Sequence, residues 1–193
     1  MTFPLTHWVN PRATIASTFQ HNDIEYATHG AVTALKMIQD MGYTFEQLKT
    51  MTVLDYGCGT GRMSRVLTPL FKHVYAYDPV HECIKEGLKE CSGMKFPNLT
   101  MAYDWNMIPE DIDIAISVSV IEHLVDKDAN IMIANLSKKV KGKTSILYSL
   151  VKNQTVIRPY LDDEQLATDT YLKREKPDSR IHGAIVDFKV KHR

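Results

Sequence analysis

Residues 53–64 read Val-Leu-Asp-Tyr-Gly-Cys-Gly-Thr-Gly-Arg-Met-Ser, and the prediction of the fold starts from this segment. Residues 52–54 predict a short buried strand that ends at Asp55. From Arg62 to Leu70 apolar residues recur at helical spacing. The glycines between strand and helix allow a tight turn that brings bare main chain against a ligand, because no Cβ stands in the way. The segment therefore predicts a nucleotide-type site with outward-pointing N–H groups at a helix N-terminus. The three alternating glycines of the turn are Gly57, Gly59 and Gly61.

The spacing of these glycines argues against two common nucleotide sites. The dinucleotide fingerprint G-x-G-x-x-G fails, because the residue three after Gly59 is Arg62. A P-loop needs a glycine five residues after its first glycine, followed by lysine, but the residue five after Gly57 is Arg62. The pattern D-x-G-x-G-x-G behind an apolar strand instead resembles motif I of the class I S-adenosylmethionine (SAM)-dependent methyltransferases. SAM has no pyrophosphate, so such a loop mainly has to let the methionine part lie against backbone. An ordinary glycine-rich loop would explain one or two of the glycines, but not three.

A second strand is predicted over residues 73–77, and it ends in Asp78. Asp78 lies 23 residues after Asp55, close to the offset at which a strand-end acid binds a ribose diol in doubly wound folds. A carboxylate can accept hydrogen bonds from both ribose hydroxyls. The alternative is that Asp78 caps the next helix, with Pro79 as its first residue. The sequence favours ribose binding.

A short third strand over residues 99–103 is followed by Asp104 and Trp105. The resemblance implies an acidic residue at this point, near the adenine amino group, and Asp104 matches it. Trp105 would then stack on the purine. The sequence supports equally well a turn aspartate beside a core tryptophan.

Residues 111–124 read Asp-Ile-Asp-Ile-Ala-Ile-Ser-Val-Ser-Val-Ile-Glu-His-Leu, which predicts a fully buried parallel strand followed by a helix. This segment resembles motif IV of the methyltransferases, in the subgroup whose fourth strand runs into a Glu-His pair. The resemblance implies that the backbone of residues 117–119 faces the methionine end of SAM, and that Glu122 and His123 border the reaction centre. If the acceptor is a hydroxyl, His123 is the first candidate for the base and Glu122 the second. Both side chains have an alternative role in capping and orienting the helix.

Metal-dependent relatives complete the same Glu-His pair with a preceding carboxylate, in the pattern Glu-x-x-Glu-His. Ser119 stands where that first glutamate would be. Because Mg²⁺ prefers carboxylate oxygens, we expect no metal site. The cofactor-binding residues that the motifs and the resemblance together indicate are Asp55, Gly57, Cys58, Gly59, Gly61, Asp78, Pro79, Asp104, Trp105, Ser117 and Val118.

The composition of the 193 residues favours a cytoplasmic protein. The three cysteines lack C-x-x-C spacing and the even number of a disulfide framework, which fits a reducing compartment. The first residues lack a signal-peptide pattern, and the longest nearly apolar run, residues 112–121, is too short to span a bilayer. The formal net charge is zero, although residues 1–137 carry 10 Lys/Arg against 16 Asp/Glu and residues 138–193 carry 13 against 7. Such asymmetry can guide an anionic substrate, but solvated surface lysines are the commoner explanation.

The predicted fold is an α/β doubly wound domain over residues 25–193, preceded by an N-terminal arm over residues 1–24. The resemblance implies a seven-stranded, mostly parallel sheet in the order 3-2-1-4-5-7-6 with helices on both faces. Two alternating runs, residues 169–175 and 184–191, predict its antiparallel C-terminal hairpin. The predicted function is methyl transfer from SAM to an oxygen or nitrogen acceptor, most simply on a small molecule. The alternatives are a nucleic-acid methyltransferase, which the basic C-terminal segment hints at, and a catalytically silent subunit that binds a partner protein. The sequence does not identify the acceptor or the oligomeric state.

Overall fold

The computed structural model describes residues 23–93, 95–121, 124, 126–149, 171–173 and 181–187. Residues 1–22 of the predicted arm lie outside this range, as do Glu122 and His123 and the short helix that we expect over residues 162–167. No helix in the described part of the chain is long and apolar enough to cross a bilayer.

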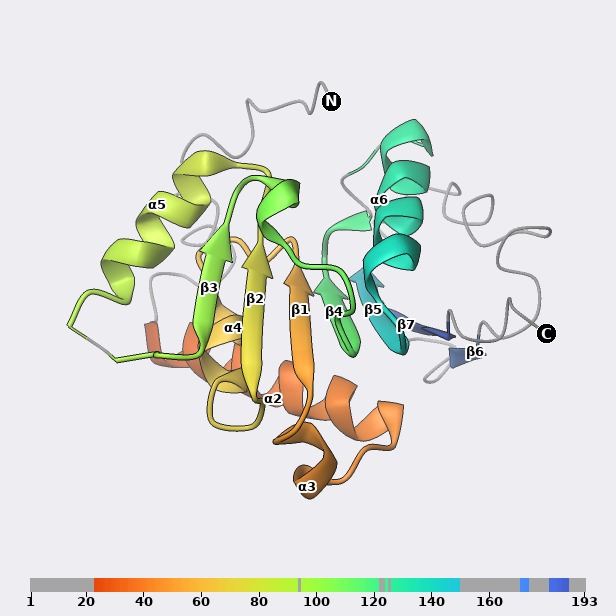
Figure 1. Ribbon diagram of the computed structural model, residues 1–193, viewed down its shortest axis with the longest axis horizontal. Coiled ribbons are helices and arrows are strands. Elements are labelled where there is room, and N and C mark those ends of the chain that lie inside the picture. Colours follow the sequence, from red (N-terminus) through yellow and green to blue (C-terminus); the bar gives the residue numbers. More distant parts are fainter. Residues whose placement is uncertain are drawn as a thin grey trace.

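The strands form one sheet in the order β3-β2-β1-β4-β5-β7-β6, which is the order that the resemblance implies (Figure 1). The first five strands pair in parallel, whereas β7 is antiparallel to both β5 and β6. The mixed α/β architecture with a parallel sheet is thereby confirmed. The strands are β1 (Thr52–Tyr56), β2 (His73–Tyr77), β3 (Leu99–Ala102), β4 (Ile114–Val118), β5 (Lys143–Ser149), β6 (Tyr171–Lys173) and β7 (Ile181–Asp187).

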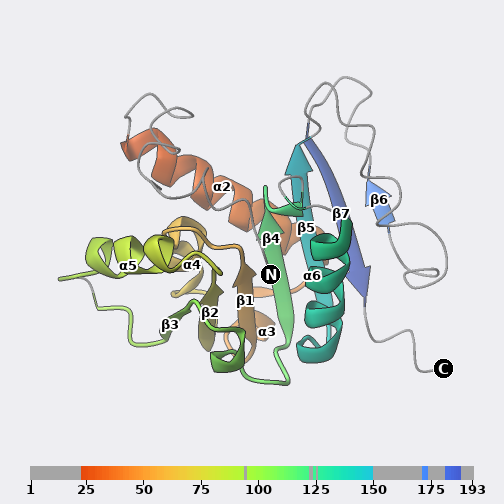
Figure 2. The same cartoon turned by 90° about the horizontal axis from the view of Figure 1, so that it is seen from above.

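Helices cover the two faces of this sheet, and Figure 2 shows the strands between α2 on one side and α6 on the other. Helix α4 ends three residues earlier than the spacing of its apolar residues suggests. The helices are α2 (Asp23–Met41), α3 (Phe45–Leu48), α4 (Arg62–Leu67), α5 (His81–Glu90) and α6 (Asp126–Lys139), with a single 3-10 turn, η2 (Trp105–Met107), after β3.

Side chains of β1 point alternately to the two faces of the sheet, so the core has one layer on each face. Val53 packs into the cluster made with α2, α3 and α4, whereas Leu54 packs into the cluster made with α6. Successive side chains of a strand point to opposite faces, so one short strand serves both layers. Helix α2 contributes Ala34, Met37, Ile38 and Met41 at helical spacing, whereas Val32 and Leu35 of the same helix are exposed.

The parallel pairing of β1 to β4 brings the carboxyl ends of these strands to one edge of the sheet. The glycine loop, Asp78, Asp104 and Ser117 therefore follow neighbouring strands at this edge. In open α/β sheets, ligands bind outside the carboxyl ends of the strands. The fold thus places these predicted site residues at the carboxyl edge of the sheet, where ligand sites of open α/β sheets lie.

At the opposite edge, Asp113 joins the start of β1 to the start of β4. Asp113 Oδ2 accepts hydrogen bonds from the N–H of Thr52 at 2.7 Å and from its Oγ1 at 2.9 Å. Thr52 Oγ1 is also 3.1 Å from the N–H of Asp113. This reciprocal arrangement fixes the register of the two central strands far from the glycine loop.

We expect Asp113→Ala to lower the free energy of unfolding by about 2 kcal/mol, because it leaves two partly buried donors of Thr52 without their charged acceptor. Denaturant unfolding measures this change. The matched control is Asp111→Asn, at an exposed ion pair to Lys141, for which we expect a change under about 0.5 kcal/mol. Equal effects of the two substitutions would contradict the proposed role of Asp113.

Candidate active site

The acidic residue of the glycine segment, Asp55, is fully buried within β1. Ser64 Oγ in α4 donates a 2.6 Å hydrogen bond to Asp55 Oδ2, whereas Oδ1 receives none from any residue that the structure describes. Asp55 pairs with Ala76 and Ile116 in the sheet, and β1 continues to Tyr56. The prediction that the strand ends at Asp55 is therefore wrong by one residue, and the carboxylate lies inside the protein, against α4.

The glycine loop folds back over the end of β2. The N–H groups of Gly57 and Cys58 both donate to the carbonyl oxygen of Tyr77, at 2.7 and 3.0 Å, and Gly61 N–H donates to Cys58 O at 2.9 Å. The three loop glycines have φ of 75°, 56° and 81°, left-handed values that only glycine adopts freely. The predicted outward N–H groups are wrong for these residues, because the left-handed turns direct them inward. The N–H groups of Gly57, Cys58 and Gly61 are therefore already bound within the protein and do not face a phosphate.

Bare main chain faces open space at one point of this loop. A Cβ built on Gly59 would meet no atom within 4 Å. At Gly57, in contrast, a Cβ would lie 2.2 Å from Cγ2 of Val120, so that side chain covers the first glycine. Val120 follows Ser119, whose φ of 53° turns the chain sharply after β4. The open backbone that the sequence predicts is therefore present at Gly59, but not at Gly57.

Asp78 fastens the loop to the end of β2. Its Oδ2 accepts a 2.9 Å hydrogen bond from the N–H of Gly59, and its Oδ1 accepts one of 2.9 Å from the N–H of Val80. Helix α5 begins at His81 with Val80 as its N-cap, so Asp78 is not the N-cap residue and Pro79 is not the first helical residue; Asp78 instead binds the N–H of the N-cap residue. Pro79 lies half-buried between the two. Each carboxylate oxygen of Asp78 retains capacity for a second hydrogen bond.

The two carboxylates give this end of the sheet a negative character. Burial raises the pKa of Asp55 to about 6, although the Ser64 hydroxyl and the positive charge of Arg62 oppose the shift. Burial likewise raises the pKa of Asp78 to about 6, against hydrogen bonds from the N–H groups of Val80 and Gly59. The negative charge of Asp78 itself adds to the raised pKa of Asp55. A site of this kind favours a cationic ligand over an anionic one.

Cys58 lies beneath the loop and not on its outer surface. It packs with Ala76 and Ile84 in a small apolar cluster. Burial raises the pKa of its thiol well above the usual range. The thiol is therefore a core group and not a nucleophile.

Asp104 and Trp105 form a turn aspartate beside a tryptophan that packs on the core, which is the alternative to adenine binding given above. Asp104 is exposed, and its Oδ1 accepts hydrogen bonds from the N–H and Nδ2 of Asn106, so it caps the turn η2. The ring of Trp105 meets those of Tyr56 and Tyr77 edge-on, with centroids 5.5 and 5.0 Å apart. The half-buried indole thus packs against the core on the α6 side of the sheet, and its proposed role against adenine remains a prediction.

Ser117 and Val118 end β4, beside the glycine loop. Ser117 is fully buried, and its Oγ receives no hydrogen bond from the residues that the structure describes. Val118 packs partly into the cluster on the opposite face. Within the described residues no group of three His, Cys, Asp or Glu side chains is arranged to hold a metal.

Sequence reasoning missed two contacts that shape the site. Ser64 binds the buried carboxylate of Asp55, and Val120 covers Gly57. A polar residue on the apolar stripe of a predicted helix is a signal that would have pointed to Ser64. No sequence signal indicates which side chain lies over a given glycine.

We expect the raised pKa of Asp55 to appear in the pH dependence of stability. A carboxyl group with a folded pKa of about 6 and an unfolded value of 3.8 stabilises the fold at low pH, and this contribution is lost as the pH rises through 6. Asp55→Asn removes the titration but keeps an oxygen for Ser64. The free energy of unfolding of this variant, relative to the wild type, should rise by about 2 kcal/mol from about pH 4.5 to about pH 7.5. Urea unfolding at the two pH values measures it, and a difference that does not change with pH would contradict the raised pKa.

A family model described as a methyltransferase domain matches residues 26–176, which is most of the chain. The chain belongs to this methyltransferase family. The predictions of an enzyme, of the class I SAM-dependent methyltransferases and of SAM as its cofactor are thereby confirmed. A search of curated protein sequences gives no match.

Solved structures resemble the methyltransferase at low sequence identity. Magnesium protoporphyrin IX methyltransferase from Synechocystis, with bound SAM, superimposes with a TM-score of 0.62 at 17% identity, over 85% of this chain and 80% of that one. A TehB-like SAM-dependent methyltransferase from Corynebacterium glutamicum gives a TM-score of 0.62 at 19% identity, over 94% and 97%. An rRNA methylase from Streptococcus thermophilus gives 0.57 at 16% identity, over 80% and 95%. These likenesses support the fold, and their different acceptors leave the acceptor of this methyltransferase undetermined.

Proposed function

We propose that the methyltransferase holds SAM against the open backbone at Gly59, with the ribose on Asp78, and transfers the methyl group to an oxygen or nitrogen of a small molecule. One observation carries the proposal: the N–H groups of Gly57 and Cys58 bind the carbonyl oxygen of Tyr77, while the buried carboxylates of Asp55 and Asp78 lie beside the loop. That combination disfavours the phosphates of other nucleotides. It suits a ligand that carries a sulfonium and an ammonium group and no phosphate.

Bound SAM supplies a methyl group that its sulfonium already activates. The protein's part is to hold an acceptor in line with that methyl and to exclude water, because charge disappears from the sulfonium during transfer. The open surface at Gly59 and the main chain of residues 117–119, at the carboxyl end of β4, supply the walls of the proposed cofactor site. We retain His123 as the proposed base for a hydroxyl acceptor, and Glu122 as the second candidate.

The charge distribution favours a small acceptor over nucleic acid. Residues 1–137, which contain all of the proposed cofactor contacts, carry 10 Lys/Arg against 16 Asp/Glu. A polyanion is bound chiefly by surplus basic side chains, and this part of the chain has a deficit. Only residues 138–193, with 13 Lys/Arg against 7 Asp/Glu, favour a nucleic-acid methyltransferase as the second candidate.

Two glycine substitutions test the proposed cofactor contact. Gly59 and Gly93 both have positive φ and both have open space where a Cβ would stand, but Gly93 lies in the turn after α5. We expect each substitution to alanine to cost about 1 kcal/mol of stability through backbone strain. Only Gly59→Ala should weaken SAM binding, by about tenfold or more, because its methyl group occupies the proposed ligand surface. Calorimetric titration with SAM measures the affinity, and equal affinities of the two variants would refute the contact at Gly59.

Transfer of isotopically labelled methyl groups tests the acceptor. The protein is incubated with methyl-labelled SAM and with cell extract divided into small-molecule, protein and RNA fractions. We expect label in the small-molecule fraction, and we expect Gly59→Ala to reduce it. Label confined to RNA would overturn the small-molecule acceptor. SAM binding without label in any fraction would favour the catalytically silent subunit.

A further inference from the structure

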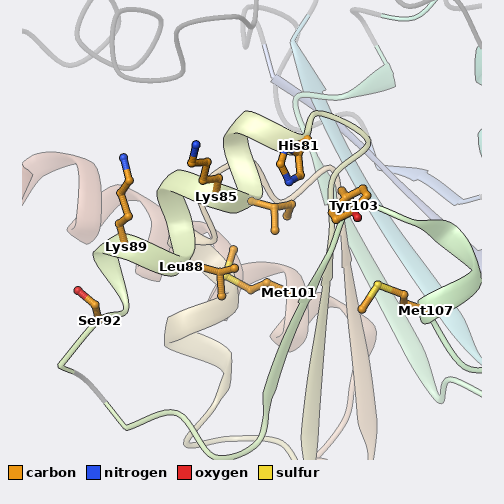
Figure 3. A pocket seen from close by; sticks show the side chains of 9 residues that line it. His81, Lys85, Leu88, Lys89, Ser92, Met101, Tyr103 and Met107 are labelled. Carbon is orange, nitrogen blue, oxygen red and sulfur yellow. The ribbon is translucent and has the colours of Figure 1, made fainter.

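A hollow of about 570 Å³ lies between α5 and the edge of the sheet at β3, outside the proposed cofactor site (Figure 3). Its floor is apolar, made by Ile84 and Leu88 of α5 and by Met101 of β3. The rings of His81 and Tyr103 stand edge-to-face at its upper end, with centroids 4.7 Å apart.

This hollow leaves large apolar side chains in contact with water. Leu88 is 55% exposed, Tyr103 51% and Met107 53%, so three of the most exposed large apolar residues of the described chain gather at one place. Single exposed apolar residues need no explanation, but a contiguous group of them marks an interaction surface.

The adjoining strand has an unpaired main-chain edge. Strand β3 ends the sheet, and among the described strands it pairs with β2 alone. Val74 N–H donates to Asn98 O and Asp78 N–H donates to Ala102 O, so the main-chain groups of alternate residues face β2. By this alternation the N–H and C=O of Met101, between them, point away from the sheet. They offer a donor and an acceptor to an added strand.

The charged side chains at the rim of the hollow favour an acidic peptide over a nucleic acid as its ligand. Lys89 is paired with Glu86 at 3.1 Å and Arg65 with Glu90 at 2.8 Å, whereas Lys85 forms no ion pair with any described residue. Helix α5 carries three glutamates against two lysines, which disfavours a nucleic acid. One uncompensated ammonium group beside an apolar floor fits a carboxylate flanked by apolar side chains.

We infer that this edge binds an extended segment of a partner protein, which adds to the sheet beside β3. Main-chain hydrogen bonds to Met101 hold the segment, alternate apolar side chains enter the hollow, and an acidic side chain reaches Lys85. The inference does not depend on methyl transfer, because the added segment would contact β3 and the side chains of α5, whereas the proposed cofactor contacts are at Gly59 and Asp78.

Selection of peptides against the whole chain tests this surface. The probe is a phage-displayed library of random linear peptides of about seven residues, the length of a typical strand. We expect enriched peptides to alternate apolar residues and to contain Asp or Glu. The best peptide is then synthesised with single N-methyl groups on successive residues. Methylation should weaken binding by about tenfold at alternate positions only, because only alternate N–H groups face β3.

Three variants connect peptide binding to the proposed surface. Lys85→Glu and Leu88→Glu should each weaken the peptide by about tenfold, whereas Lys49→Glu, an exposed lysine at the end of α3, should not. All three should keep the wild-type affinity for SAM, which shows that they fold and separates this test from the proposed function. Absence of enriched peptides, or indifference to N-methylation, would overturn the inference. Tight binding of an RNA oligonucleotide that Lys85→Glu abolishes would show nucleic acid as the occupant instead.

Discussion

The proposed site depends on the burial of two carboxylates at the carboxyl end of a parallel sheet. Asp78 holds the glycine loop through the N–H of Gly59, and Asp55 is held against α4 by Ser64. Burial disfavours the ionised form of each carboxyl group, and the pKa of each is therefore raised. The fold tolerates this cost because the charged forms organise the loop and prepare a negative site. Stability is thereby sacrificed at the point where the ligand is proposed to bind.

The direction of the loop amides separates this site from the phosphate sites that share its topology. In a phosphate site the N–H groups of the glycine turn converge on an anion. Here the N–H groups of Gly57 and Cys58 converge on the carbonyl oxygen of Tyr77. These two N–H groups are therefore not free to bind an anion.

The sequence alone predicts the elements of this fold well, because apolar periodicity marks them and glycines separate them. The resemblance to methyltransferases supplies the strand order, and the acidic end of the second strand makes Asp78 the candidate for binding ribose. The inward amides, the side chain of Val120 over Gly57 and the packing of Trp105 on Tyr56 and Tyr77 could not be predicted. Each of these is a contact between segments distant in sequence, which no local pattern encodes. The hollow beside β3 escaped prediction for the same reason, since it forms only when α5 lies against the sheet edge.

The left-handed turn at Ser119 has a consequence for how this protein can diverge. Its φ of 53° is strained for most side chains and severely so for β-branched ones. Glycine and asparagine would relieve that strain, whereas valine or isoleucine would force the chain out of the turn and carry Val120 away from the loop. Natural variants of this position should therefore be drawn from a small set of compact residues, even though the side chain itself is exposed to solvent.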